Sequence, residues 1–191
     1  MSSIFFTQKM RNAIRFATEV HAGQIRKGKP LETYIIHPLS VGLILARAGA
    51  TEDMIVAGIL HDTIEDCEPY GSVTKELIEE KFGKEVARMV NDVTEQDKTL
   101  PWEERKRAAL EHIKEMKKDS VMLKTADALQ NISDLLLDIE IKGEKAYQHF
   151  NAPKDALIKR FESLVAELER VYPDNPLLPE LKKDVAKIVP V

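Results

Sequence analysis

Apolar residues recur along most of the chain with the spacing of amphipathic α-helices. Residues 8–21 are representative, because their apolar positions return about every 3.6 residues and so share one helical face. The alternation of polar and apolar residues that marks a β-strand has no counterpart of useful length. Residues 33–36 have β-like composition but are too few for a sheet. The pattern predicts an all-α protein.

Capping residues, glycines and prolines divide this pattern into separate helices. Pro38 lies in the first turn of one predicted helix, where proline is tolerated, and Thr51-Glu52-Asp53 is predicted to cap the next. Asp119 and Ser120 are expected to cap a long apolar helix. Short connections between helices predict a single domain over residues 1–191. The predicted helices cover roughly residues 8–21, 37–48, 52–66, 72–82, 84–94, 102–117, 121–139 and 151–171, before a short terminal helix.

Composition and charge narrow the class of ligand. The chain is 43% hydrophobic with a net charge of -4, so it is globular and has no overall basic field for a nucleic-acid polymer. Its apolar stretches, 39–46 and 54–60, are far shorter than the roughly 20 residues that span a membrane. A single cysteine, Cys67, excludes an internal disulfide and fits a reducing compartment. We expect a cytoplasmic protein whose partner is a small molecule, with protein partners unknown.

A cluster of ionisable residues carries the strongest chemical signal. It follows the uncharged stretch 54–60 and consists of His61, Asp62, Glu65 and Asp66. Burying such a group is costly unless a cation or dense hydrogen bonding compensates, and a divalent metal is the simplest solution. Members four positions apart share a helix face. The first two residues are adjacent at a helix end and can both bind one ion, and the last two lie one turn away, where they can orient or deprotonate an attacking water.

Three further segments strengthen this interpretation. Tyr34-Ile-Ile-His37-Pro38 places a histidine at a helix start after a loop. Lys124-Thr-Ala-Asp127-Ala-Leu-Gln-Asn131 places a carboxylate and an amide one turn apart in an apolar helix. His21-Ala-Gly-Gln24-Ile-Arg26-Lys27-Gly28 is a basic loop just before His37, suited to an anionic ligand. His112 and His149 lie outside these segments and are expected to be structural.

Together these segments resemble the HD-domain phosphohydrolases. More closely, they resemble the hydrolase domain of the RelA/SpoT family and its small single-domain relatives. The resemblance runs from about Phe16 to Asp134 and includes many ordered matches, whereas the last 50 or so residues offer nothing for function. Besides the segments already quoted, the matches are Phe82-Gly83, Val93-Thr94, Asp97-Lys98-Thr99 and Glu104-Arg105-Lys106.

The resemblance implies a fold, a cofactor and a reaction. The fold would be an HD-type helical bundle, and the reaction would remove the 3′-pyrophosphate of the alarmone ppGpp to leave GDP. One divalent ion, typically manganese, would be the cofactor, and Glu65 and Asp66 would position the attacking water. Arg26, Lys27 and Asn131 would hold the nucleotide. The metal ligands would be His37, His61, Asp62 and Asp127.

The chain departs from the family pattern beside Asp127. The family usually has Ala-Asp-Arg-Leu-His-Asn there, and this chain has Ala128 for the arginine and Gln130 for the histidine. The substrate identity therefore stays open between ppGpp and another nucleotide, which an HD-type nucleotidase or phosphatase would hydrolyse. A third hypothesis is a non-catalytic nucleotide-binding module, which the intact ligand set and Glu65-Asp66 disfavour.

Overall fold

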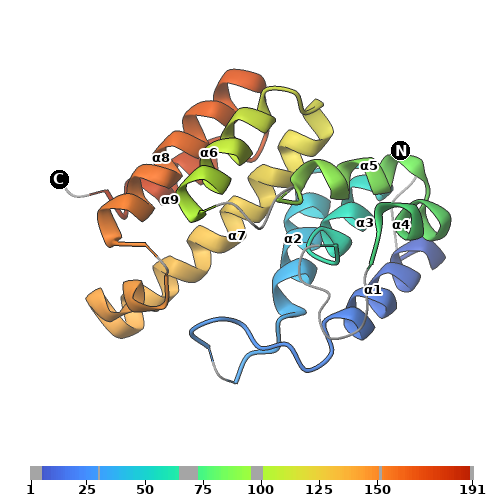
Figure 1. Ribbon diagram of the computed structural model, residues 1–191, viewed down its shortest axis with the longest axis horizontal. Helices are drawn as coiled ribbons and strands as arrows, with labels where there is room; N and C mark the ends of the chain where they lie inside the picture. Colours follow the sequence, from blue (N-terminus) through green and yellow to red (C-terminus); the bar gives the residue numbers. More distant parts are fainter. Residues whose placement is uncertain (1–5, 30, 65–72, 96–100, 151, 190–191) are drawn as a thin grey trace. The chain divides into compact units, whose positions relative to one another are not determined.

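The computed structural model describes residues 6–29, 31–64, 73–95, 101–150 and 152–189 as helices joined by turns and loops (Figure 1). The predicted all-α class is confirmed. Within the described ranges, β pairing is confined to one bridge between Ile25 and Thr33. The chain divides into two compact units, Met1–Lys98 and Thr99–Val191. The single domain over residues 1–191 stays a prediction.

The first unit is organised around a short buried helix. Its helices are α1 (Gln8–Val20), α2 (Ile36–Arg47), α3 (Glu52–Leu60), α4 (Lys75–Phe82) and α5 (Lys84–Val93). Helix α3 packs against α1, α2 and α5, and every residue from Met54 to Leu60 is buried. Within the predicted capping segment 51–53, Thr51 is the N-cap, and its hydroxyl accepts a hydrogen bond from the Met54 N–H.

Two glycines let α2 and α3 approach closely. A Cβ atom at Gly58 would lie 2.6 Å from Leu45 Cδ1, and one at Gly42 would lie 2.8 Å from Ile59 Cγ1. Both distances are too short for non-bonded carbon atoms, so larger residues would force the two helices apart or displace buried side chains. The contact matters because His37 lies at the start of α2 and His61 directly follows α3.

Helix α3 ends earlier than predicted. The prediction extended it to about Asp66, but it ends at Leu60, and residues 61–64 form a turn. The Thr63 N–H and the Thr63 hydroxyl both donate to the Leu60 carbonyl oxygen, at 3.0 and 2.7 Å. These bonds satisfy a carbonyl that a continuing helix would use, and so they tighten the last turn. His61 and Asp62 therefore lie in a turn, and Glu65 and Asp66 lie outside the described residues.

The second unit contains the longest helix. Its elements are α6 (Trp102–Ile113), α7 (Lys118–Lys142), the 3₁₀ helix η1 (Gly143–His149), α8 (Lys154–Val171) and α9 (Leu178–Ala186). Helix α7 packs against η1, α8 and α9. The predicted cap at Asp119 and Ser120 is wrong, because both residues lie in the first turn of α7. An acidic residue there is still favourable, since it faces the positive end of the helix dipole.

A buried amide attaches the segment before α9 to α7. The Asn175 side-chain amide donates to the Thr125 hydroxyl at 2.7 Å, and that hydroxyl donates to the Val121 carbonyl oxygen at 2.8 Å. The Asn175 side-chain oxygen accepts the Leu177 N–H at 3.1 Å. Each of these buried polar groups is paired, so the network holds the connection to α9 against the middle of α7.

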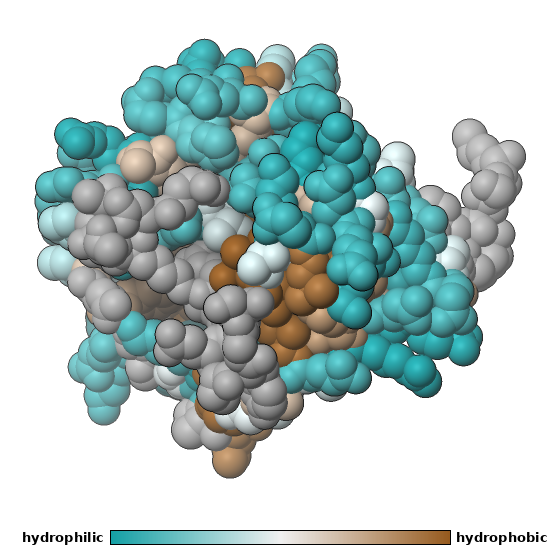
Figure 2. All heavy atoms as spheres, turned by 45° about the vertical axis from the view of Figure 1, so that its right-hand side comes forward, coloured by the Kyte–Doolittle hydropathy of each residue, from teal (hydrophilic) through white to brown (hydrophobic). Residues whose placement is uncertain are grey.

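Apolar residues reach the surface in limited areas. On the face in Figure 2, hydrophobic residues gather near the centre and at a projection along the lower edge. Among the residues that the structure describes, the two most exposed large apolar side chains are Leu31 and Leu43, at 98% and 70%. None of the described helices combines the length and the apolar character needed to cross a membrane.

Candidate metal centre

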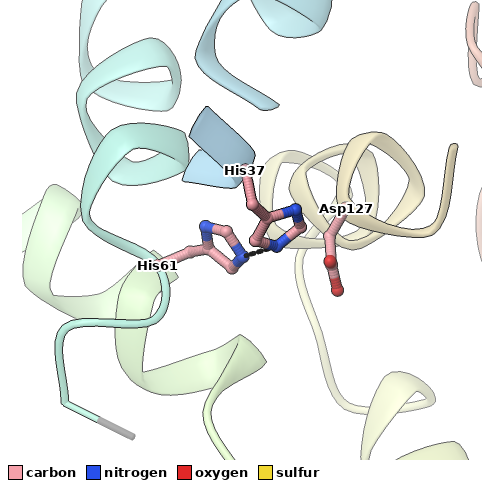
Figure 3. A group of neighbouring side chains, drawn as sticks. All are labelled: His37, His61 and Asp127. Carbon is pink, nitrogen blue, oxygen red and sulfur yellow. Dashed lines mark hydrogen bonds between the residues drawn. The ribbon is translucent and has the colours of Figure 1, made fainter. Parts of the chain in front are cut away.

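Three donor atoms of the first unit converge at the ends of α2 and α3. The Nε2 atoms of His37 and His61 lie 3.2 Å apart, and both rings are buried (Figure 3). Asp62 Oδ2 lies 3.3 Å from His37 Nε2 and 3.2 Å from His61 Nε2. The three atoms thus form a nearly equilateral triangle. The structure brings together three of the four predicted ligands within one unit.

The size of this triangle fits the coordination of one small divalent ion. Two ligand atoms about 2.1 Å from a metal, at tetrahedral or octahedral angles, are roughly 3.0–3.4 Å apart. Two imidazole nitrogens and a carboxylate oxygen suit manganese, iron or zinc. The residues therefore fit the metal that the sequence predicted.

The His61 ring is held in the orientation and tautomer that metal binding requires. Its Nδ1–H donates to the Gly58 carbonyl oxygen at 2.8 Å. Because a carbonyl oxygen can only accept, the proton of the neutral ring resides on Nδ1, and Nε2 keeps its lone pair. A backbone carbonyl behind a histidine is a common way to orient a metal ligand.

Asp62 is set up to stay ionised although it is largely buried. Burial alone raises the pKa of its carboxyl group, but the charge of His61 and hydrogen bonds from His37 and His61 act more strongly together. The pKa of Asp62 is therefore well below its ordinary value. An ionised carboxylate beside two imidazoles gives the triangle the negative charge that a divalent cation needs.

Tyr34 links Asp62 to the basic loop. Its hydroxyl donates to Asp62 Oδ2 at 2.7 Å, and the guanidinium carbon of Arg26 lies 5.6 Å from the centre of its ring. Lys27 is exposed in the same loop. Sequence reasoning noticed Tyr34 within a motif but gave it no role. The available signal was its position three residues before His37.

The second unit contributes its own carboxylate, Asp127, in the middle of α7. Asp127 Oδ1 accepts a hydrogen bond from Asn131 Nδ2 at 2.6 Å, and Lys124 Nζ lies 2.9 Å from Asp127 Oδ2. His37, His61 and Asp127, which are drawn in Figure 3, each offer one atom that can bind a metal. Asn131, predicted to contact the nucleotide, thus contacts Asp127. Ala128 and Gln130, the departures from the family pattern, are both buried.

The described residues form an all-α fold, and the triangle is a candidate site for a divalent metal. A sequence model of the HD domain matches residues 13–154, and the chain belongs to this family. A guanosine-3′,5′-bis(diphosphate) 3′-pyrophosphohydrolase MESH1 of Xenopus tropicalis is 43% identical over 125 residues, 64% of this chain and 67% of the relative. MESH1 of Homo sapiens is 38% identical over 129 residues, 66% of this chain and 69% of the relative.

Solved structures agree with the sequence relatives. A metazoan orthologue of SpoT, described as hydrolysing ppGpp, matches with a TM-score of 0.81 and 25% identity, covering 96% of this chain and 97% of its own. A Listeria monocytogenes protein matches with a TM-score of 0.71 and 33% identity, covering 80% and 97%. These matches support the HD-type helical fold that the sequence predicted.

Proposed function

We propose that this protein is a metal-dependent hydrolase that removes the 3′-pyrophosphate of ppGpp. The observation that carries the proposal is the triangle of His37, His61 and Asp62, found in a chain 38–43% identical to MESH1 hydrolases. Water attacks the phosphorus atom that is bonded to the ribose 3′-oxygen. The bond between this phosphorus and the 3′-oxygen breaks. The products are GDP, whose 3′-oxygen takes a proton, and pyrophosphate.

The remaining site residues take roles that follow from their chemistry. Asp127 is the fourth proposed ligand of the metal. Glu65 and Asp66 hold the attacking water and accept its proton. Arg26 and Lys27 bind the phosphates, and guanidinium groups suit phosphate oxygens especially well. Asn131 orients Asp127 through its hydrogen bond, besides its predicted contact with the nucleotide.

The cofactor is a divalent metal, for which we propose manganese. When bound, such an ion supplies positive charge to the phosphate and favours deprotonation of the attacking water. The chain's own contribution is to orient the His61 ring through Nδ1 and to keep Asp62 ionised. A cytoplasmic location is also proposed, on the single cysteine, Cys67.

Comparing substrates tests the function. With manganese supplied, we expect ppGpp to give GDP and pyrophosphate faster than nucleoside 5′-monophosphates lose phosphate, as measured by chromatography of the products. Glu65→Gln should lower turnover roughly 100-fold or more with metal content near wild type, since it removes only the basic oxygen. Turnover by the wild type in excess chelator would contradict the metal-dependent mechanism.

The second candidate is an HD-type hydrolase that acts on another nucleotide. It is favoured by Ala128 and Gln130, which replace the charged or titratable residues of the family pattern. Turnover of a deoxynucleoside monophosphate at least tenfold faster than ppGpp, in the same assay, would select this candidate.

A further inference from the structure

We propose that Tyr34 is a positioning residue that couples the basic loop to the metal centre. Its hydroxyl orients Asp62, and its ring supports Arg26. The contact between the hydroxyl and Asp62 concerns metal binding alone. The contact between the ring and Arg26 rests on the proposed function, because it assumes that Arg26 contacts the nucleotide.

A hairpin places Tyr34 beside the loop residues. The Arg26 N–H donates to the Glu32 carbonyl oxygen at 2.9 Å, and the Tyr34 N–H donates to the Gln24 carbonyl oxygen at 2.9 Å. These bonds flank the bridge between Ile25 and Thr33. The backbone of Tyr34 is therefore hydrogen-bonded to the segment that carries Arg26.

The Tyr34 hydroxyl bonds the carboxylate oxygen that lies nearest the two imidazole nitrogens. Tyr34 Oη donates to Asp62 Oδ2 at 2.7 Å, and this is the same oxygen that lies near both imidazoles. A carboxylate can rotate about its last side-chain bond, so an oxygen without a donor would sample several directions. A hydrogen bond to an ionised oxygen is short and directional, and it holds Oδ2 at the corner of the triangle.

The ring contacts both the loop and the first ligand. Arg26 lies within the usual cation–π range of the ring, at 5.6 Å. The ring centres of His21 and His37 lie 4.9 and 5.9 Å from that of Tyr34. His21 is itself held by Gln24, with 2.7 Å between His21 Nδ1 and Gln24 Oε1. A shift of the loop therefore moves a ring that is packed against His37 and bonded to Asp62.

This arrangement makes metal binding and nucleotide binding depend on each other. A nucleotide that fixes Arg26 also fixes the Tyr34 ring and hence Asp62. By thermodynamic linkage, a metal that fixes Asp62 must strengthen nucleotide binding by the same factor. Tyr34→Phe removes the hydroxyl and keeps the ring, whereas Tyr34→Leu removes both, so the two contacts can be separated.

Metal titration tests the first contact. Manganese is titrated into the metal-free wild type, Tyr34→Phe and the control Tyr172→Phe without nucleotide. The control is matched because Lys118 Nζ lies 4.8 Å from the Tyr172 ring centre in the second unit. We expect Tyr34→Phe to bind manganese about 10- to 100-fold more weakly, as is usual when a group behind a ligand is lost. Affinity within twofold of wild type would overturn the proposal.

A double-mutant cycle tests the second contact, with KM for ppGpp measured at saturating manganese. Arg26→Ala should raise KM in the wild type and in Tyr34→Phe, but by less than twofold in Tyr34→Leu. An equal rise in all three backgrounds would overturn the coupling. If the wild type does not hydrolyse ppGpp, the proposed function fails, and the manganese titration still decides whether Tyr34 supports Asp62.

Discussion

Asp62 and Asp127 are both carboxylates with a proposed metal role, but their surroundings differ. Asp62 lies beside two imidazole nitrogens and accepts a hydrogen bond from a tyrosine hydroxyl, all in the first unit. Asp127 contacts Lys124 and Asn131, which lie one turn before and one turn after it on α7. The carboxylate of Asp62 thus lies beside imidazole nitrogens that can bind the same metal ion. The charge of Asp127 already has an ammonium group beside it.

Because of this difference, we expect the two carboxylates to contribute unequally to the affinity for the metal. A metal that binds Asp62 meets two imidazole nitrogens at the right spacing. A metal that binds Asp127 through Oδ2 must compete with Lys124 or use the other oxygen, which Asn131 occupies. We therefore expect the first unit to provide most of the affinity for the metal and Asp127 to adjust it.

The largest expected effect separates the two carboxylates directly. Asp62→Ala should lower the affinity for manganese by more than about 100-fold, because it removes the charged corner of the triangle. Asp127→Ala should lower it by roughly tenfold, in the range seen when one supporting group of a metal site is lost. Elemental analysis after dialysis and manganese titration measure both. Equal losses of manganese affinity in the two variants would contradict this expectation. They would mean that the ammonium group of Lys124 does not weaken metal binding by Asp127.

A smaller effect is expected from the helix contact that sets the spacing of the triangle. Gly58→Ala places a Cβ 2.6 Å from Leu45 Cδ1 and should push α3 away from α2. We expect about 1–3 kcal/mol lower stability, as for other overpacked cores, and roughly tenfold weaker manganese binding. Chemical denaturation and titration give the two values.

Leu45→Ala is the control for Gly58→Ala. It should cost about 2–5 kcal/mol through a cavity. It forces no separation of the helices and should disturb metal binding less. If the loss of manganese affinity in both variants were proportional to their loss of stability, the glycine contact would have no specific role in the site.

The smallest effect concerns Lys124. Lys124→Met keeps the length of the side chain and removes the ammonium group that contacts Asp127. Manganese should then bind a few-fold more tightly, because the ion no longer competes with a charge already in place. Weaker binding would show instead that Lys124 orients Asp127 for the metal. Isothermal titration of the metal-free variant distinguishes the two outcomes.

The sequence was sufficient for the helical class and for the residues of the triangle, because both depend on local patterns. Helical periodicity is local, and His37, His61 and Asp62 lie in short motifs. The end of α3 was missed because Thr63 terminates it through its own hydrogen bonds, with no glycine or proline nearby to signal a stop. The role of Tyr34 was missed because its partner is 28 positions away and meets it only through the hairpin.

The start of α7 shows a second limit of local rules. Asp119 and Ser120 have the composition of a cap, yet the helix begins at Lys118 after Lys117, which makes no side-chain cap hydrogen bond. Packing of the long apolar face against η1, α8 and α9 extends the helix past its best capping residues. Such tertiary contacts cannot be read from the spacing of residues in one segment.

The buried amide of Asn175 has a consequence for biosynthesis. It reaches Thr125 across 50 positions of sequence, so the middle of α7 completes its packing only after that later segment has left the ribosome. Domains generally fold as units from the N-terminus, while synthesis proceeds at about 5–20 residues per second. His37, His61 and Asp62 are all translated before α7 begins. If the first unit folds before α7 is complete, the proposed ligands His37, His61 and Asp62 come together before Asp127 is available.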